Sequence, residues 1–369
     1  MEIIHIVLGK ANPERMNGVN KVVFQLATEQ AKAGKEVAVW GITKELTHNY
    51  GERVFSTLLF QEKKNPFAID KHLSESLKGK IGKAVFHIHG GWIPIFYSIA
   101  KLLSQHKIPF VFTPHGAYNS IAIKKSKWIK RLYFNIFEKQ LLLRAAKIHC
   151  IGKSEVEGLK KIFRTDKTFL LPYGFDMNNS RTRKSENSGS LFTIGFVGRI
   201  DLYTKGLDLL INAFESLYQI DKNIRLWIVG DGDGKAELDK WVSTKNLQDF
   251  VTLWGSKFGS EKDELLLQFD LFVHPSRNEG LPSAVLEAAS FGVPCLVTEA
   301  TNVGDIVRAY NCGEVIENEN VAALRDGLSK LKTQWEADKL KLLSANSIKM
   351  VAEAFNWEHI VKEYDKLYS

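Results

Sequence analysis

The sequence has few cysteines, few prolines and no apolar run long enough to cross a membrane. Three of its 369 residues are cysteine (Cys150, Cys295 and Cys312), and they are far apart and form no CxxC pair. A disulfide framework or a zinc site is therefore not expected, and a reducing compartment is the simplest assignment. The apolar runs stay short of the roughly 18 residues of a membrane span, and Met1 to Gly9 has no signal-peptide pattern. We therefore expect a cytoplasmic protein.

The overall composition is that of a folded protein. Nine prolines and 27 glycines, with 44% hydrophobic and 25% charged residues, exclude a disordered, collagen-like or coiled-coil chain. The length is too great for one ordinary domain and suits two domains of about 150 to 200 residues each.

Charge is distributed unevenly between the two halves of the chain. Residues 1–180 hold 28 Lys and Arg against 14 Asp and Glu, whereas residues 181–369 hold 22 against 28, so the net charges are +14 and −6. A basic half indicates an anionic partner, such as nucleic acid, an anionic membrane or a phosphorylated substrate. The alternative is that the lysines only make this half soluble, and the charge count leaves both open.

Short β-rich runs alternate with segments of helical periodicity, which is typical of βα units and mainly parallel sheets. The predicted strands are 3–8, 36–41, 85–89, 110–113, 147–151, 169–171, 193–197, 225–229, 251–254, 271–274 and 294–297. The predicted helices are 20–33, 127–145, 206–218, 235–245, 262–268, 283–291, 321–332 and 357–368.

One polar segment divides the chain. Residues 177–190 are nearly free of apolar side chains and are predicted to be a linker between residues 1–176 and 191–354. We expect an α/β protein of two Rossmann-like, doubly wound domains facing a central cleft, with the last helix (355–369) packed back on the first domain. Ligands of such sheets bind beyond the carboxyl ends of the strands.

The most informative motif follows the predicted strand that ends at His274. A loop carries Glu279, Gly280 and Leu281, and a helix that begins near Pro282 carries Glu287. Free N–H groups at the start of a helix form an anion site. Glu279 is expected just outside the helix and Glu287 inside it, about one and a half turns further on, which is a poor arrangement for hydrolysis of one bond. They are better suited to holding two parts of a long ligand through its hydroxyl groups.

Two cations, Arg199 and Lys205, follow another predicted strand and flank the start of the helix at Gly206. Cations at a helix N-terminus neutralise a diphosphate without a metal ion. The alternative is a surface salt bridge with Asp201 or Asp208.

These motifs, in this order, resemble the family 4 (group 1) glycosyltransferases, which are retaining enzymes of GT-B fold. The Glu279–Glu287 pair matches their E-x7-E motif. The other matching segments are Asn17–Val19, Thr113–Gly116, Pro172–Asp176, Val197–Ile200 with Lys205–Gly206, Val229–Gly232 and Phe355–Glu358. The sequence departs from the family at Asn17, where many relatives have glycine, and at Tyr173, where asparagine is common.

The resemblance implies a role for each matching residue. Arg199 and Lys205 would bind the donor diphosphate, Glu287 the ribose, and Glu279 the transferred sugar with the amides of Gly280 and Leu281. Base recognition is expected near Trp254, and Gly18 would approach the phosphates. His115 would act with Glu279, Arg199 and Lys205 in catalysis. The acceptor side would include His89, Asn17 and Asn20, and the alternative for His89 is a strand-end histidine satisfied by the backbone.

No metal ion and no other cofactor is expected. Asp231-Gly232-Asp233 spells the DxD motif of metal-dependent sugar transferases, but it lies between a predicted strand and a helix, which indicates a turn. No GxGxxG motif follows the first strand, which argues against a nicotinamide dehydrogenase.

The segment 123–134 combines five basic residues with aromatic ones. Such a stretch lies on an anionic bilayer in some proteins, and in others it is a helix packed by Trp128, Leu132 and Phe134 with solvated lysines. Both interpretations stay open. Without a recognised nucleic-acid module, no nucleic-acid partner is expected.

We therefore expect a metal-independent, retaining hexosyltransferase. It would transfer a sugar from a UDP- or GDP-sugar to a glycan or lipid-linked acceptor in bacterial surface polysaccharide biosynthesis. It would be cytoplasmic or peripheral on the inner face of the cell membrane. The alternatives are a phosphate- or nucleic-acid-binding module and a GT-B epimerase or phosphorylase.

Overall fold

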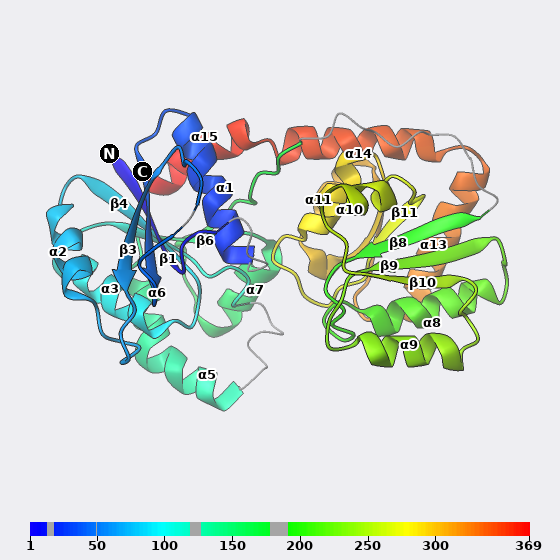
Figure 1. Ribbon diagram of the computed structural model, residues 1–369, viewed down its shortest axis with the longest axis horizontal. Helices are drawn as coiled ribbons and strands as arrows, with labels where there is room; N and C mark the ends of the chain where they lie inside the picture. The colour runs from blue at the N-terminus through cyan, green and yellow to red at the C-terminus, as the bar shows by residue number, and fades with distance from the viewer. Residues whose placement is uncertain (13–17, 49, 119–126, 178–190) are drawn as a thin grey trace. The chain divides into compact units, whose positions relative to one another are not determined.

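A computed structural model describes residues 1–12, 18–48, 50–118, 127–177 and 191–369 (Figure 1). The chain divides into two compact units: unit 1 comprises Met1–Gly174 and Trp357–Ser369, and unit 2 comprises Phe175–Asn356. Asn17 and all but the first residue of the predicted linker 177–190 lie outside the described residues. The same is true of residues 123–126 of the basic segment.

The described part of unit 1 is built on a parallel sheet of seven strands, in the order β3-β2-β1-β4-β5-β6-β7. The strands are β1 (Glu2–Leu8), β2 (Val37–Thr43), β3 (Ser56–Gln61), β4 (Ala84–His89), β5 (Phe110–Thr113), β6 (Lys147–Cys150) and β7 (Thr168–Leu170). In the register of the central strands, His5 is opposite His87, and His89 is opposite Thr113. Paired residues of parallel strands project to the same face, so these polar side chains gather on one side of the sheet.

Helices cover both faces of this sheet. They are α1 (Gly18–Lys32), α2 (Lys71–Gly79), α3 (Pro94–Gln105), α5 (Lys127–Tyr133), a π-helical turn η1 (Phe134–Glu138), α6 (Lys139–Arg144), α7 (Lys153–Ile162) and α15 (Trp357–Tyr368). A large apolar core lies between the sheet and α2, α3, α6 and α7, and a smaller one lies beneath α1.

The C-terminal helix α15 belongs to unit 1, where it lies beside α1 (Figure 1). The hydroxyl of Tyr368 accepts a hydrogen bond from Gln30 of α1 at 3.1 Å, and Asp365 pairs with Lys35 at 2.7 Å. The chain therefore enters unit 2 after Gly174 and returns to unit 1 at Trp357.

The described part of unit 2 holds a second parallel sheet, of six strands in the order β10-β9-β8-β11-β12-β13. The strands are β8 (Phe192–Val197), β9 (Ile224–Val229), β10 (Val251–Gly255), β11 (Leu271–His274), β12 (Cys295–Thr298) and β13 (Gly313–Ile316). Both sheets are parallel and interleaved with helices, so the predicted α/β fold of two doubly wound units is confirmed.

The helices of unit 2 also lie on two faces. They are α8 (Leu207–Tyr218), α9 (Lys235–Thr244), α10 (Gly259–Leu266), α11 (Ser283–Ser290), a 3-10 turn η2 (Glu299–Thr301), α12 (Gly304–Tyr310), α13 (Val321–Glu336) and α14 (Leu340–Ala354). One core packs α8, α9 and α13 on the sheet, and the other packs α10, α11, α12 and α14. In the described ranges, no helix is both long and apolar enough to span a bilayer.

One predicted helix differs from the structure. The continuous α-helix expected over residues 127–145 is interrupted by the π-helical turn η1. A π turn adds a residue to the helical repeat, and it accompanies the inward position of Glu138. This carboxylate is buried and accepts hydrogen bonds from the Trp92 amide and the Tyr118 hydroxyl at 2.9 and 2.6 Å.

Candidate functional site

In unit 2, Lys205 and Glu279 form the centre of a polar cluster beyond the carboxyl ends of β8 and β11. Gly206 follows Lys205 and adopts a left-handed φ of 68°, and a Cβ there would lie 2.1 Å from the carbonyl oxygen of Pro275. Only glycine fits this turn, which brings the loop before α8 against the loop after β11.

The Glu279 carboxylate has two partners at the same oxygen. Lys205 Nζ lies 2.5 Å from Oε1, and His274 Nε2 lies 2.7 Å from it. Burial by itself would raise the pKa of Glu279, but the hydrogen bond and charge from His274, together with Lys205, outweigh burial and lower the pKa to about 2. Glu279 is therefore an anion at neutral pH.

The ring of His274 is fixed by its surroundings. It is buried and stacks between Phe196 and Phe272, with ring centroids 5.6 and 6.0 Å away and interplanar angles of 6° and 12°. This packing aims Nε2 at Glu279. His274 is the last residue of β11, so strand geometry sets the position of the carboxylate.

The loop that carries Glu279 and Gly280 is held from the other side by Asn302. The side-chain amide of Asn302 donates to the carbonyl oxygens of Glu279 and Gly280 at 2.7 and 2.8 Å. Leu281 and Pro282 then lead into α11. The first N–H groups of a helix have no partner within it, so this loop and helix start offer backbone donors.

Glu287 lies on α11 between buried apolar neighbours, Leu286 and Ala288. Its side chain is 19% exposed and pairs with Lys262 of α10 at 2.5 Å. The carboxylate thus has the polar partner that a buried position requires. It also keeps a limited opening to solvent.

Arg199 is placed differently from Lys205. Its side chain is 70% exposed and pairs with Asp201 at 3.1 Å. Asp208, the other alternative partner from the sequence, instead binds Arg277 through two hydrogen bonds of 2.7 Å. An exposed pair with Asp201 holds Arg199 only weakly, so its guanidinium is free to turn toward a ligand.

Two further sequence features lie in unit 2. Trp254 is part of β10, is 38% exposed and packs edge-on against Trp227, with centroids 5.1 Å apart. Asp231-Gly232-Asp233 lies between β9 and α9, as predicted for a turn, and the Asp231 side chain accepts a hydrogen bond from the Gly232 amide.

In unit 1, Gly18 is the first residue of α1, and Asn20 is the third. The Asn20 side chain is buried, accepts a hydrogen bond from the Ala11 amide at 2.8 Å and donates to the Leu8 carbonyl at 3.2 Å. These bonds fix the chain that leaves β1, so Asn20 shapes the described start of this loop.

His115 lies two residues beyond β5 in a left-handed conformation, with φ of 55°. The following amide, of Gly116, donates to the buried Glu155 carboxylate at 2.6 Å. The ring of Tyr173 lies parallel to that of His115, with centroids 5.7 Å apart and an interplanar angle of 17°. Tyr173, the departure from the family pattern, therefore packs on the predicted catalytic histidine.

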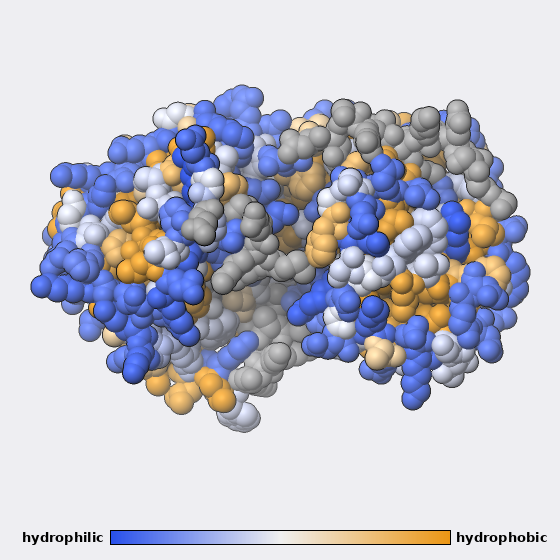
Figure 2. Space-filling model, viewed as in Figure 1, coloured by the Kyte–Doolittle hydropathy of each residue, from blue (hydrophilic) through white to orange (hydrophobic). Residues whose placement is uncertain are grey.

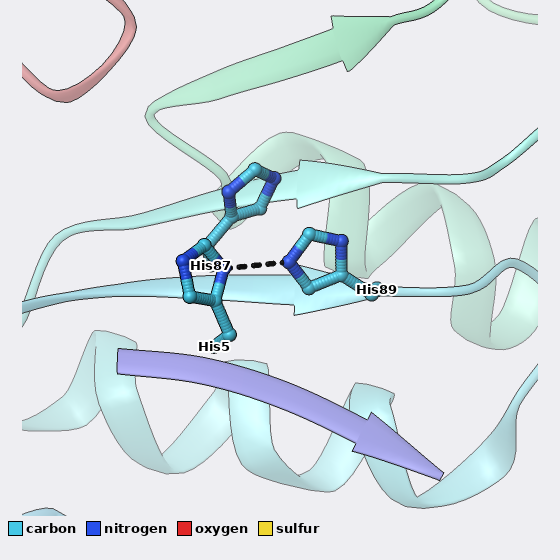
Figure 3. A group of neighbouring side chains, drawn as sticks. All are labelled: His5, His87 and His89. Atoms are coloured by element: carbon cyan, nitrogen blue, oxygen red, sulfur yellow. Dashed lines mark hydrogen bonds between the residues drawn. The ribbon is translucent and has the colours of Figure 1, made fainter. Parts of the chain in front are cut away.

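His89 belongs to a buried histidine cluster with His5 and His87 (Figure 3). The three rings come from β1 and β4, and Nδ1 of His5 lies 2.9 Å from Nε2 of His89. Burial and, for His87 and His89, the neighbouring imidazoles lower the pKa of each ring, to about 4 for His5 and well below the usual value for His87 and His89.

Among the described residues, this cluster could present ligand atoms to a metal ion, since one nitrogen from each ring lies within 4.8 Å of the others. However, His5 and His89 hydrogen-bond each other, and His87 bonds Tyr368 and Thr113. A metal ion would have to break these bonds.

A pocket of about 590 Å³ opens at the carboxyl ends of β1 and β2 in unit 1. Polar side chains line it, among them Lys10, Thr43, Glu45 and Tyr50. Ligands of doubly wound sheets bind at this end of the strands, so the pocket is a candidate subsite for a hydroxyl-rich molecule.

Sequence reasoning missed several residues that organise these sites. His274 directly precedes the loop that carries Glu279. Its role in orienting Glu279 depends on stacking with Phe196 and Phe272, which no local sequence pattern reveals. Asn302 and Lys262 reach the site from distant segments. For Tyr173, the departure from the family pattern was the one available signal.

Solved structures of similar shape define the class. HepE from Anabaena, in complex with UDP and glucose, matches with a TM-score of 0.73 and 16% identity over 100% of this chain and 99% of its own. Sucrose-phosphate synthase from Thermosynechococcus elongatus matches with a TM-score of 0.72 and 18% identity over 100% and 98%. The fold is that of the GT-B glycosyltransferases.

The sequence narrows this class to a family. The family model for glycosyl transferases group 1 matches residues 178–350, and that for glycosyltransferase family 4 matches residues 16–179. The chain therefore belongs to the family 4 (group 1) glycosyltransferases, as the motifs predicted, and it is a glycosyltransferase.

Two relatives illustrate the range of the family. GDP-mannose:cellobiosyl-diphosphopolyprenol alpha-mannosyltransferase from Xanthomonas campestris is 24% identical over 377 residues, which are 99% of this chain and 95% of the relative. The capsular polysaccharide biosynthesis glycosyltransferase CapM from Staphylococcus aureus is 22% identical over 287 residues, which are 74% and 73% of the two chains.

Proposed function

We propose that the protein transfers a hexosyl group, with retention of anomeric configuration, from a UDP- or GDP-sugar to a glycan or lipid-linked acceptor. The observation that carries the proposal is the Lys205–Glu279 pair. It places a partly buried cation and an anion 2.5 Å apart beyond the carboxyl ends of the unit 2 strands, and the exposed Arg199 follows one of these strands, β8.

The two cations and two carboxylates suit different parts of such a donor. Arg199 and Lys205 would bind the diphosphate, with the first amides of α11 nearby. Glu279 would turn from Lys205 toward the hydroxyl groups of the sugar, and Glu287 would hold the ribose. Trp254 lies on β10, where the base would be recognised. The relatives are consistent with this donor class, because one is named for GDP-mannose and HepE was solved with UDP.

The proposed reaction breaks the bond between the anomeric carbon and the diphosphate oxygen, whose electron pair leaves with the nucleotide. The acceptor hydroxyl attacks the same face of the sugar, and its proton goes to the departing phosphate oxygen. Arg199 and Lys205 would stabilise the charge that grows on the diphosphate. These two cations take the place of a divalent ion, so the proposed reaction is metal-independent.

Unit 1 would bind the acceptor. The pocket of about 590 Å³ beside Lys10, Thr43 and Tyr50 has the polar lining that a glycan requires. A lipid-linked acceptor would also bring the protein to a membrane. The Xanthomonas relative acts on a diphosphopolyprenol-linked disaccharide by name, and CapM is named for capsule synthesis. We therefore propose a role in surface polysaccharide assembly at the inner face of the cell membrane.

The described end of the basic segment supports membrane contact. On α5, the side chains of Trp128, Ile129 and Leu132 are 80%, 76% and 64% exposed. Figure 2 shows apolar surface beside hydrophilic surface where α5 lies. Next to it, a pocket of about 350 Å³ is lined by Trp92 and three cations, Lys130, Arg131 and Lys161. Apolar side chains beside cations suit an anionic headgroup region.

Nucleotide-induced thermal stabilisation tests the proposal. A ligand at a hundred times its dissociation constant stabilises the folded state by about 2.7 kcal/mol, so UDP or GDP should raise the melting temperature, whereas an oligonucleotide should not. Product analysis then follows with the nucleotide sugar that binds. Transfer with the donor's anomeric configuration supports the proposal, and epimerised nucleotide sugar or phosphorolysis products contradict it.

A further inference from the structure

In unit 1, a continuous line of hydrogen bonds, here called the relay, joins the predicted catalytic His115 to a backbone carbonyl. Every hydrogen bond in it joins two side-chain atoms, except the last, which ends on a backbone carbonyl oxygen. In order from His115, the links are to His89 (3.0 Å), His5 (2.9 Å), Gln30 (2.7 Å), Tyr368 (3.1 Å), His87 (2.9 Å), Thr113 (2.5 Å), His149 (2.9 Å) and the carbonyl oxygen of Leu171 (2.8 Å).

The carbonyl end of the relay sets its direction. The Leu171 oxygen only accepts, so Nε2 of His149 carries a proton and Nδ1 of a neutral His149 is an acceptor. Thr113 must then donate its single hydroxyl proton to His149, which leaves its oxygen to accept from Nε2 of His87. Nδ1 of His87 in turn accepts from the hydroxyl of Tyr368.

The remaining hydrogen bonds, from Tyr368 to His115, follow in the same direction. The Tyr368 hydroxyl donates its only proton to His87, so its oxygen accepts a hydrogen bond from the side-chain amide nitrogen of Gln30. This bond fixes the orientation of the Gln30 amide. The Gln30 oxygen then accepts from Nε2 of His5, and His5 Nδ1 accepts from Nε2 of His89. His89 Nδ1 therefore accepts from Nε2 of His115, and Nδ1 of His115 keeps its lone pair.

The histidine rings of the relay are neutral because they are buried. Burial lowers the pKa of all five histidines of the relay, with nearby imidazoles adding to the effect at three of them, to about 4 for His5 and His149 and to about 3 for His115. Near pH 7 each ring carries one proton, so each nitrogen is either a donor or an acceptor.

We infer that the relay holds His115 in its Nε2–H tautomer, so that its Nδ1 meets a bound substrate as a hydrogen-bond acceptor. Gln30, Tyr368, Thr113 and the other histidines are then positioning residues. The only described partner near Nδ1 is the Tyr173 hydroxyl at 3.3 Å, which is long for a hydrogen bond. Given the proposed function, the ligand group would be a sugar hydroxyl, which donates, rather than a phosphate oxygen, which cannot.

The helix α15 offers a matched pair of variants. Tyr368→Phe removes the hydroxyl that links Gln30 to His87. Tyr364→Phe removes a hydroxyl one turn away on the same helix, from a buried tyrosine for which the described residues provide no hydrogen-bond partner. Both substitutions delete one tyrosine hydroxyl from α15, but only Tyr368→Phe interrupts the relay.

Nitrogen-15 NMR of histidine-labelled protein reads the tautomer directly, with the His115 signals assigned by their loss in His115→Gln. We expect one tautomer, Nε2–H, in the wild type and in Tyr364→Phe, and a mixture of the two tautomers in Tyr368→Phe. A mixture in the wild type, an Nδ1–H tautomer, or an unchanged single tautomer in Tyr368→Phe would overturn the inference.

A second pair keeps the test decisive if Tyr368→Phe does not fold. Thr113→Val removes the hydroxyl between His87 and His149 with little change of shape, whereas Thr113→Ser retains it. The valine variant should give mixed His115 tautomers and the serine variant a single one. Equal spectra for the two would count against the relay.

The tautomer is measured on the free protein, so it does not depend on the proposed function. Failure of UDP and GDP to stabilise the protein would contradict the donor assignment, while the NMR result would still decide the inference. With an active donor, Tyr368→Phe should raise KM about twofold if half of the molecules carry the wrong tautomer, and Tyr364→Phe should leave KM unchanged.

Discussion

Lys205 and Glu279 are 74 positions apart in the chain, yet their side chains meet at 2.5 Å. The left-handed turn at Gly206 and the stacked ring of His274 hold the two loops together. In the pair, the charges of the ammonium and the carboxylate compensate each other, so neither is an unpaired charge inside the protein. A diphosphate sugar would take both partners at once, since its phosphates suit Lys205 and its hydroxyls suit Glu279.

Replacement of Lys205 or Arg199 by alanine should abolish most transfer. Each cation is proposed to act on charge that grows as the diphosphate leaves, and the loss of one preorganised group costs about 3 kcal/mol, or roughly a hundredfold in kcat. Steady-state kinetics measures this. Lys235→Ala is the control, because Lys235 is exposed and pairs only loosely with Asp231, at 3.5 Å. Near-normal turnover in both Lys205→Ala and Arg199→Ala would remove the diphosphate assignment.

The ribose assignment of Glu287 predicts a loss of nucleotide affinity. Hydrogen bonds to a charged group contribute about 1.5–3 kcal/mol, so Glu287→Gln should weaken UDP or GDP binding about tenfold to a hundredfold in calorimetry. Glu261→Gln is a matched control, since Glu261 also pairs with a lysine, Lys257, but is 68% exposed. Equal affinities for the two variants would contradict the assignment.

Removal of divalent ions should leave turnover intact. The proposed reaction places Arg199 and Lys205 on the diphosphate, and Asp231 and Asp233 lie in the connection between β9 and α9. Activity measured after EDTA treatment should match that of untreated enzyme, and the double variant Asp231→Asn with Asp233→Asn should behave as the wild type. Inactivation by EDTA that Mg²⁺ or Mn²⁺ reverses would show that the reaction uses a metal ion.

The buried histidines predict loss of stability in acid. Their pKa values are lowered in the folded state by burial, to about 4 for His5 and His149 and about 3 for His115. The unfolded chain takes up protons below its ordinary pKa near 6.5 and the folded chain does not, so stability is full above pH 6.5 and falls toward pH 4. Urea unfolding at a series of pH values measures the slope.

Glu138 should affect the pH dependence of folding stability in the direction opposite to the histidines. Burial raises its pKa to about 7, against hydrogen bonds from Trp92 and Tyr118. The folded state thus holds this proton between pH 4.5 and 7 while the unfolded state releases it, which offsets part of the histidine effect. Glu138→Gln should therefore steepen the loss of stability in acid by up to about 1.4 kcal/mol per pH unit. A shallower slope in Glu138→Gln would show that the carboxylate is ionised when folded.

The central strands and the motif loops could be predicted because their signals are local. The apolar runs that end at Leu8, His89 and His274 coincide with strand ends, and the Glu279–Glu287 spacing marks a loop and a helix. Two edge strands, β3 and β13, were missed, whereas the edge strands β7 and β10 were predicted. Exposure alternates along much of β3 and stays partial along β13. Tertiary packing, which leaves no local pattern, determines those strands.

The relay could not be predicted for a related reason. His87 and His89 alternate along β4, but His5 and His149 are single histidines in β1 and β6, and only the parallel register brings them to the same face. Gln30 and Tyr368 join them from helices 338 positions apart. Spacing along the sequence carries no information on such a contact.

The membrane proposal predicts salt-sensitive binding to anionic vesicles. Basic residues near such a surface contribute about 1 kcal/mol each, over a Debye length of ~8 Å at physiological salt. Changing Lys124, Lys125, Lys127 and Lys130 together to serine should therefore release the protein from phosphatidylserine vesicles in sedimentation, while donor hydrolysis should remain. Equal sedimentation of the wild type and the quadruple variant would assign this cluster to an ordinary solvated surface.

A single apolar residue on α5 distinguishes membrane insertion from charge attraction alone. Ile129 and Ile220 have nearly equal exposure, 76% and 78%, but only Ile129 lies beside Trp128 and the cations of α5. Burying an isoleucine in the headgroup region contributes up to roughly 1.5–3 kcal/mol. Ile129→Ser should therefore weaken vesicle binding about tenfold or more, and Ile220→Ser should leave it unchanged. If both variants bind as the wild type does while the lysine variant is released, the contact is electrostatic and α5 does not insert.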